Sequence, residues 1–247
     1  MGRRSREKQG RRERRRSPTA FGDFLDERLE ELSSDCEGAC AQYGDDVIEQ
    51  ALQEPAFIKH IALNILEPLA KRDRQAAIRI IHAECDKELS QIEDQTLGEI
   101  ACRRGCHWCC HIQVQADRSE VTAIAESLNQ RLSVEEMSLL RNRVASWETE
   151  FGCAGRALCP LNVNGECSVY DQRPLTCRGF NSGDAQKCQI AYERCFALGS
   201  TVPIPRLPMV ITRCGDIALR LARGFLGMRT QESEPVVLAP ALSRLLS

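Results

Sequence analysis

The sequence predicts a mainly α-helical protein with a small β-hairpin and cysteine-rich loops that form a metal site. Two observations predict this class: apolar residues recur at helical spacing along most of the chain, and half of the 14 cysteines gather in two short segments. The 247 residues suffice for one substantial domain or two small ones. We expect four parts, which are a disordered basic arm at 1–20, a helical region at 21–100, a cysteine-cluster metal-binding domain at 101–200, and C-terminal helices at 201–247 that pack on the core.

The N-terminal arm is basic and has little to bury. Nine Lys and Arg stand between Arg3 and Arg16, so ordering the arm would lose more entropy than burial could return. Such an arm attracts nucleic acid or acidic proteins electrostatically, but the whole chain has a net charge of only −2 and does not indicate a nucleic-acid partner. No secretory apolar segment follows the arm, and no run reaches the roughly 18 apolar residues of a membrane span. We therefore expect a cytoplasmic protein with reduced thiols and no membrane partner.

Apolar residues at helical spacing predict four helices ahead of the cysteine cluster, over 21–33, 47–54, 57–68 and 78–100. Cys36 and Cys40, with Gly38 between them, are expected in a turn and are interpreted as ordinary thiols. Cys85 belongs to the apolar stripe of the last helix, where a free cysteine packs as a small hydrophobe, although His82 stands three residues before it. The region 21–100 is either a face for a protein partner or half of the core.

Two capped helices separate the cysteine-rich segments. Asp117 or Ser119 caps a helix over 121–132. Ser133 to Glu136 reads Ser-Val-Glu-Glu, a capping box that opens a second helix over 134–151. We expect the two helices to form an antiparallel hairpin that brings the second segment back against the first.

Short strands and further helices complete the pattern. Alternating residues at 112–116 permit a strand. Asn164-Gly165 between short apolar runs predicts a hairpin with a type I′ turn, which presents Cys167. Further helices are expected over 184–198 and 207–225, and the apolar stretch 236–246 is expected to dock as a helix.

The most specific feature is the segment from Cys102 to Cys110, Cys-Arg-Arg-Gly-Cys-His-Trp-Cys-Cys, which holds four thiols in nine residues. Thiols spaced in this way in a tight turn aim at one point about 2.3 Å away, as zinc and iron–sulfur sites require, and Gly105 suits the turn. The candidate ligands from both segments are Cys102, Cys106, Cys109, Cys110, Cys159, Cys167 and Cys177, with Cys188 as an outer candidate. Seven or eight thiols suit two zinc ions, one iron–sulfur cluster with spare thiols, or one metal beside a redox pair.

Charge supports metal binding, and two other interpretations stay open. Arginines beside the cysteines oppose the negative charge of thiolates; they are Arg103, Arg104, Arg173 and Arg178. The spacing Cys102-x3-Cys106-x2-Cys109 matches radical S-adenosylmethionine enzymes, but that class needs a strand before the motif, where a helix is expected here. The adjacent Cys109 and Cys110 could instead support metal-free thiol redox chemistry.

The two-part motif resembles the YkgJ-type cysteine-cluster family, which is described as chelating zinc or iron. The matching residues are Cys-x3-Cys-x2-Cys-Cys and, after a helical spacer, Cys-Pro-Leu and Gly-x-Cys-Ser-Val-Tyr-x2-Arg-Pro-x2-Cys-Arg, between Ala101 and Arg178. The resemblance implies zinc or an iron–sulfur cluster, 4Fe–4S if iron, bound by the seven cysteines from Cys102 to Cys177 named above. The family includes flagellin lysine N-methylases, which are longer than this chain. An iron–sulfur-dependent protein-modifying enzyme is therefore the alternative function, and no reaction is assigned.

Overall fold

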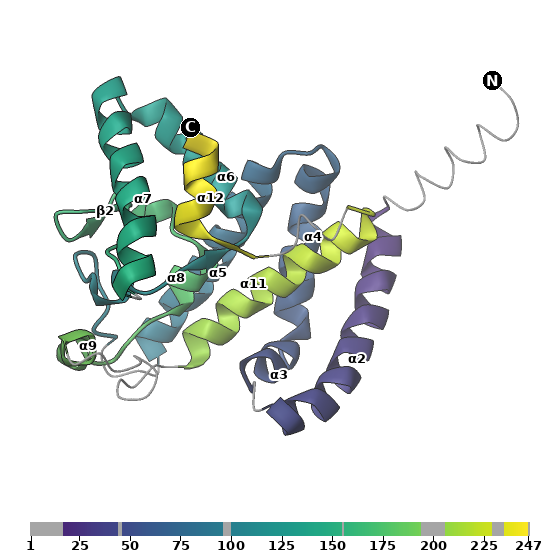
Figure 1. The fold of residues 1–247 in the computed structure, drawn as a ribbon. Coiled ribbons are helices and arrows are strands. Elements are labelled where there is room, and N and C mark those ends of the chain that lie inside the picture. The colour runs from purple at the N-terminus through teal and green to yellow at the C-terminus, as the bar shows by residue number, and fades with distance from the viewer. Residues whose placement is uncertain are drawn as a thin grey trace, which may run out of the picture. The chain divides into compact units, whose positions relative to one another are not determined.

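The computed structural model describes residues 17–43, 46–95, 100–154, 156–193, 206–228 and 235–246. The chain is mainly helical, as predicted, and its described strands form two antiparallel sheets of two strands each (Figure 1). It divides into two compact units, Met1–Cys85 with Val210–Ser233, and Asp86–Met209 with Glu234–Ser247. The predicted C-terminal part at 201–247 thus contributes to both units. The predicted basic arm lies outside the described residues as far as residue 16.

The first unit is built from helices. They are α2 (Pro18–Tyr43), α3 (Asp46–Leu52), α4 (Pro55–Ala70), the first part of α5 (Arg74–Gln95) and most of α11 (Arg206–Phe225). Its core includes fully buried apolar side chains at helical spacing. The rings of Phe21 and Phe24 pack on Phe225, with centroids 4.7 and 5.2 Å away. Cys85 and Cys214 are buried here, which confirms the core interpretation of Cys85.

Three helix ends differ from the predictions. Helix α2 continues past Ser33 and Gly38 to Tyr43, because a single glycine costs a helix only about 1 kcal/mol and no proline stops it. Helix α4 continues through Pro68 to Ala70, because a proline in the last turn removes a single hydrogen bond. Helix α5 ends at Gln95 and Ile100 is not helical, while 96–99 lie outside the described residues.

The second unit contains the remaining elements. They are η1 (Trp108–His111), β1 (Gln115–Ala116), α6 (Arg118–Arg131), α7 (Val134–Ala154), β2 (Asn162–Val163), β3 (Glu166–Cys167), η2 (Tyr170–Gln172), α8 (Leu175–Gly179), α9 (Ala185–Glu193), β4 (Val236–Val237) and α12 (Leu238–Leu246). Both predicted caps are present. Asp117 accepts from Ser119 N at 2.7 Å and forms a capping box with Glu120, and Glu136 N donates to Ser133 Oγ at 3.2 Å.

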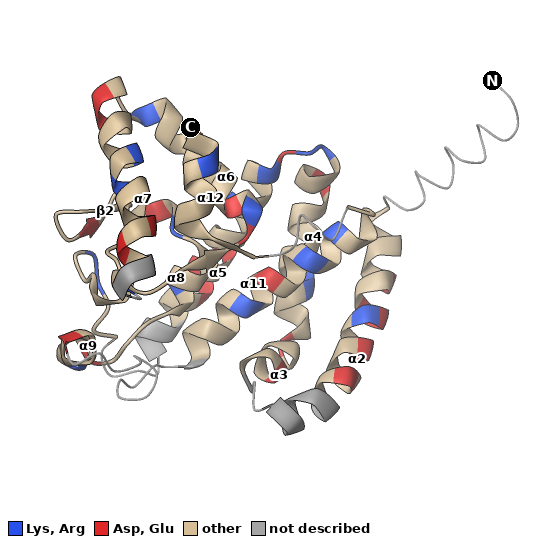
Figure 2. Cartoon of the chain, in the orientation of Figure 1, with Lys and Arg blue, Asp and Glu red and all other residues tan. Residues whose placement is uncertain are grey.

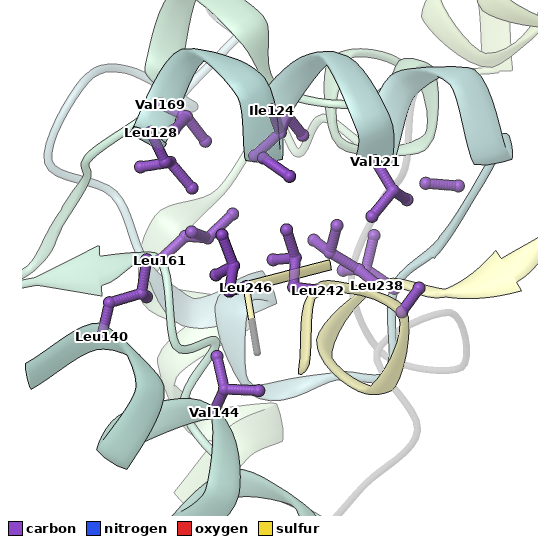
Figure 3. Packing of buried hydrophobic residues seen from close by; sticks show 14 of the residues in the cluster. Val121, Ile124, Leu128, Leu140, Val144, Leu161, Val169, Leu238, Leu242 and Leu246 are labelled. Atoms are coloured by element: carbon purple, nitrogen blue, oxygen red, sulfur yellow. The ribbon is translucent and has the colours of Figure 1, made fainter. Parts of the chain in front are cut away.

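The core of this unit lies between α6, α7 and α12, which packs against both of the other helices (Figure 3). Apolar side chains of the three helices meet there, among them Ile124 of α6, Leu140 of α7 and Leu242 of α12. Strand β4 joins β1, with Ala116 opposite Val236. The predicted C-terminal helix is therefore confirmed. Strand β4, which precedes this helix, fixes the point at which the helix enters the core.

Charged side chains of both signs are interspersed along the described helices, as Figure 2 shows for α2, α7 and α11. Several form surface pairs, such as Lys59 with Asp26 at 2.7 Å and Arg220 with Asp216 at 3.1 Å. Pairs of this kind contribute about 0–1 kcal/mol each to stability. Among the described helices, none has the length and apolar character that crossing a membrane requires.

Candidate metal centre

The first cysteine segment folds as a turn followed by a short 3-10 helix. Cys106 N donates to Arg103 O at 2.9 Å, and Gly105 takes the positive φ of +92° that such a turn needs. Cys102 and Cys106 therefore flank a tight turn, as predicted. Cys109 and Cys110 lie on η1, which begins directly after that turn.

The second segment is bonded directly to the first. Cys159 N donates to Cys110 O at 2.7 Å. The predicted hairpin is present, with φ values of +54° at Asn164 and +88° at Gly165, and it pairs Asn162 with Cys167. Cys177 lies on α8, and its neighbours Cys159 and Cys167 pack with it against the hydrophobic core. The fold thus packs the three cysteines of the second segment against that core and bonds their segment to Cys110 of the first.

Three thiols of the second segment form a half-buried group with Cys110. Burial raises the pKa of Cys177 well above its usual value, and the neighbouring thiolates of Cys159, Cys110 and Cys167 raise it further. Burial likewise raises the pKa of Cys159 to about 12, and the thiolates of Cys110 and Cys167 add to that shift. These four side chains are near enough to repel one another when ionised, and a bound cation would remove that repulsion.

Cys109 and Cys110 are coupled by a hydrogen bond between their sulfur atoms. The Cys109 S–H group donates to Cys110, which lowers the pKa of Cys110 and raises that of Cys109. Cys177 and Cys102 also lie near Cys109, since their thiolates raise its pKa as well. Cys109 therefore stands between this half-buried group and the beginning of the first segment.

Cys102, Cys106 and Cys188 form the other part of the cluster. Burial raises the pKa of Cys102 to about 11, and the thiolates of Cys106 and Cys188 contribute. Cys188 is 5% exposed on α9, and burial raises its pKa too, with a further contribution from Cys106. The structure thus places the outer candidate Cys188 beside two of the predicted ligands.

Backbone N–H groups and arginines offset the charge that these thiols would carry as thiolates. Ser182 N donates to Cys102 Sγ at 3.1 Å. Backbone N–H groups of the residues that follow Cys159 and Cys167 lower the pKa of each thiol against the effect of burial. Arg173 lowers the pKa of Cys102 and Cys167, and Arg104 lowers that of Cys167. Two of the four arginines expected to oppose the charge of the cysteines therefore do so.

One buried donor atom beside the cysteines lacks an acceptor. Asn162 Oδ1 accepts from Gly165 N at 3.0 Å, and its Nδ2 is buried beside Cys110, whose pKa the amide lowers by hydrogen bonding. Arg173 Nε is buried without a hydrogen-bond partner. A buried unpaired donor costs about 1–3 kcal/mol. Thiolates and inorganic sulfides are acceptors, so the residues present fit a sulfur-rich metal centre.

Glu120 positions Cys177 and had not been expected to contribute to the site. Its carboxylate is 3% exposed, and it accepts from Asp117 N at 3.0 Å and from Leu175 N at 2.8 Å. The second bond ties the start of α6 to the start of α8, which carries Cys177. The spacing Asp117-x2-Glu120 is the signal that could have identified a capping box here, but it carries no information about Leu175.

An aromatic group covers the first segment. The rings of His107 and Trp108 stack at 4.8 Å, and His111 lies 4.2 Å from Tyr192 of α9. The Arg156 guanidinium lies 5.5 Å from the centre of the Tyr192 ring. Burial lowers the pKa of His111, and the nearby charges of His107 and Arg156 lower it further. These effects favour the neutral imidazole of His111.

In the described part of the chain, no three His, Cys, Asp or Glu side chains stand ready-made around a single point where a metal ion could bind. The predicted metal site is therefore not formed by the described side chains as they stand. Comparison of the chain with protein-family models, with curated proteins and with solved structures finds no match in any of the three. The resemblance to the YkgJ-type family stays a prediction.

Proposed function

We propose that the chain is a metal-binding protein whose centre is held by the cysteines of the two segments. The candidate ligands are Cys102, Cys106, Cys109, Cys110, Cys159, Cys167 and Cys177. One observation carries the proposal: two segments that are about 50 residues apart in sequence are bonded through Cys159 N and Cys110 O, and their thiols are close enough to change one another's pKa. Core cysteines do not need such mutual proximity, because each can pack separately as a small hydrophobe.

We propose an iron–sulfur cluster as the group that the cysteines bind, with zinc as the alternative. Several thiols already receive backbone N–H donors, and the Nε of Arg173 beside them is buried without an acceptor. The inorganic sulfides of a cluster supply acceptors beyond the thiolates, whereas a zinc site supplies only its ligand sulfurs. The number of thiols does not separate the two, because one cluster and one tetrahedral zinc ion each take four. When bound, a cluster would supply one-electron chemistry, or would act as a structural centre.

The test is metal analysis with a visible absorption spectrum on protein purified without oxygen. We expect a brown protein with about four irons per chain. The variants Cys106→Ala and Cys177→Ala come from different segments, and both should lose metal. Cys36→Ala removes a half-buried cysteine of α2 in the other unit and should retain it.

Three outcomes separate the alternatives. A colourless protein with one or two zinc ions would indicate a structural zinc centre instead of an iron–sulfur cluster. Full metal content in Cys177→Ala would show that the two segments do not share one centre. A wild-type protein without metal would overturn the proposal and leave thiol redox chemistry at Cys109 and Cys110 as the interpretation to test.

A further inference from the structure

A pocket of about 160 Å³ lies in the same unit as the cysteines. Its lining combines charged side chains, Asp86, Arg173 and Arg178, with the apolar side chains Leu89 and Ile100. Pockets for drug-sized ligands begin at about 300 Å³. This pocket therefore fits a ligand of a few non-hydrogen atoms, and its mixture of charged and apolar walls indicates a ligand with both a charge and a carbon skeleton.

Arg178 is part of the wall, and three of its five N–H groups donate to groups of the protein. It is 2% exposed and its guanidinium donates to Arg173 O at 2.8 Å, to Asp171 O at 2.6 Å and to the carboxylate of Asp86. The charge of Asp86 is thereby balanced within the wall. Arg178 and Asp86 form a fixed frame on one side of the pocket.

Arg173 is the other cation of the pocket. Its side chain lines the pocket, and among the described residues its guanidinium forms no ion pair. Its guanidinium lies 4.3 Å from the centre of the Tyr170 ring, which holds the planar group in place. A preorganised guanidinium of this kind matches a carboxylate with two parallel hydrogen bonds.

We propose that this pocket binds the carboxylate group of a small organic acid. Arg173 binds the carboxylate, and Leu89 and Ile100 contact the short carbon chain. Inorganic phosphate has no carbon chain that could contact the apolar side chains of the pocket. A carboxylate with an apolar tail is therefore the better match. Arg173 also stabilises the thiolates of Cys102 and Cys167, so the ligand would lie beside the cysteines. The inference goes beyond the proposed metal centre and does not require it, because every group it uses belongs to the pocket.

The test is calorimetric titration of the full chain, as purified without oxygen, with propionate. Propionamide tests the need for charge, and inorganic phosphate tests the need for a carbon chain. We expect propionate to bind with a millimolar or tighter Kd and the other two compounds to bind at least about tenfold more weakly, since a charged hydrogen-bond pair is worth tenfold or more. Arg173→Gln should weaken propionate binding by about the same factor.

Arg104→Gln is the matched control. Arg104 also lies over the Tyr170 ring, at 5.4 Å, and also lowers the pKa of Cys167, but it does not line the pocket. The Arg104→Gln variant should bind propionate with the same Kd as the wild type. Ser90 of α5 also lines the pocket, so Ser90→Leu fills it while leaving Arg173 in place. This variant should abolish binding, and it tests the inference if Arg173→Gln does not fold.

Each contrary result overturns the inference. These are no binding of propionate by the wild type, unchanged binding in Arg173→Gln and Ser90→Leu, an equal loss in Arg104→Gln, or tighter binding of phosphate. Metal content is measured on every sample. A sample without metal that binds propionate through Arg173 would refute the proposed metal centre and leave this inference standing.

Discussion

Asn162 places a side-chain amide beside the Cys110 thiol, and both ends of this amide are used. Oδ1 caps the hairpin turn by accepting from Gly165 N, whereas Nδ2 is buried beside Cys110, whose pKa the amide lowers by hydrogen bonding. Asn162→Asp preserves the accepting oxygen but replaces the donor by a negative charge among thiolates. We expect metal affinity to fall by at least about tenfold, because a like charge in a buried site opposes ionised ligands. Chelator competition on the loaded protein measures the change.

Asn129→Asp provides the comparison for this change. Asn129 lies on the exposed side of α6, so the same chemical substitution adds the same charge to the surface. It should leave chelator competition unchanged. If Asn162→Asp competes for metal as well as Asn129→Asp does, the amide of Asn162 does not act on the centre.

For single residues, the sequence predicts the chemistry of neighbours in the chain but not the contacts between residues that are far apart in it. The spacing of Cys102 to Cys110 and the glycine at 105 suffice to predict thiols around a tight turn, because the turn depends only on neighbours in the chain. The roles of Asn162 and Glu120 could not be predicted in this way. Each depends on a contact made by folding, such as the bond from Leu175 N to Glu120, which spans 55 residues.

Helix α6 connects local capping to the candidate site through Glu120. Its carboxylate satisfies two backbone donors, Asp117 N and the buried Leu175 N. Glu120→Ala leaves both without this acceptor. We expect a loss of roughly 3 kcal/mol in the free energy of unfolding, since an unsatisfied buried donor costs about 1–3 kcal/mol. Urea denaturation of the metal-free protein measures it, and Glu120→Gln, which keeps one accepting oxygen, should lose less.

Glu136→Ala is the matched control for this element. Glu136 has the equivalent position in the capping box of α7, but it is exposed and its carboxylate is bonded within the cap, where it accepts from Ser133 N at 2.8 Å. Its loss should cost about 0.5–2 kcal/mol, as for other caps. Equal losses for Glu120→Ala and Glu136→Ala would show that Glu120 acts as a cap alone and does not tie α6 to α8.

The elements themselves were largely predictable, and the misses have physical causes. Periodicity and capping predicted α6 and α7, and Asn164-Gly165 predicted the hairpin, because these signals are local. Strand β4 was missed because two residues, Val236 and Val237, acquire a strand conformation only by pairing with β1 at 115–116. The end of α2 differs from the prediction because Gly38 does not stop the helix, since one glycine costs a helix only about 1 kcal/mol.

For the whole molecule, the cysteines make the stability of the metal-free protein depend on pH. Burial raises the pKa of Cys102 to about 11 and that of Cys159 to about 12, from an ordinary value of 9.0. The folded protein therefore holds these protons more tightly than the unfolded chain does. The stabilisation is fully present below pH 9, and it is lost as the pH rises from about 9 to about 12.

The measurement is urea denaturation of metal-free protein at a series of pH values from 8 to 11. The double variant Cys102→Ser with Cys159→Ser separates these thiols from Tyr and Lys residues that titrate in the same range, since serine does not ionise there. We expect the wild type to lose more stability than the double variant as the pH rises, and the metal-loaded protein to lose less than the metal-free one. Bound metal holds the thiols as thiolates, so ionisation no longer opposes folding. Parallel curves for the wild type and the double variant would mean that these two thiols are not buried as the structure places them.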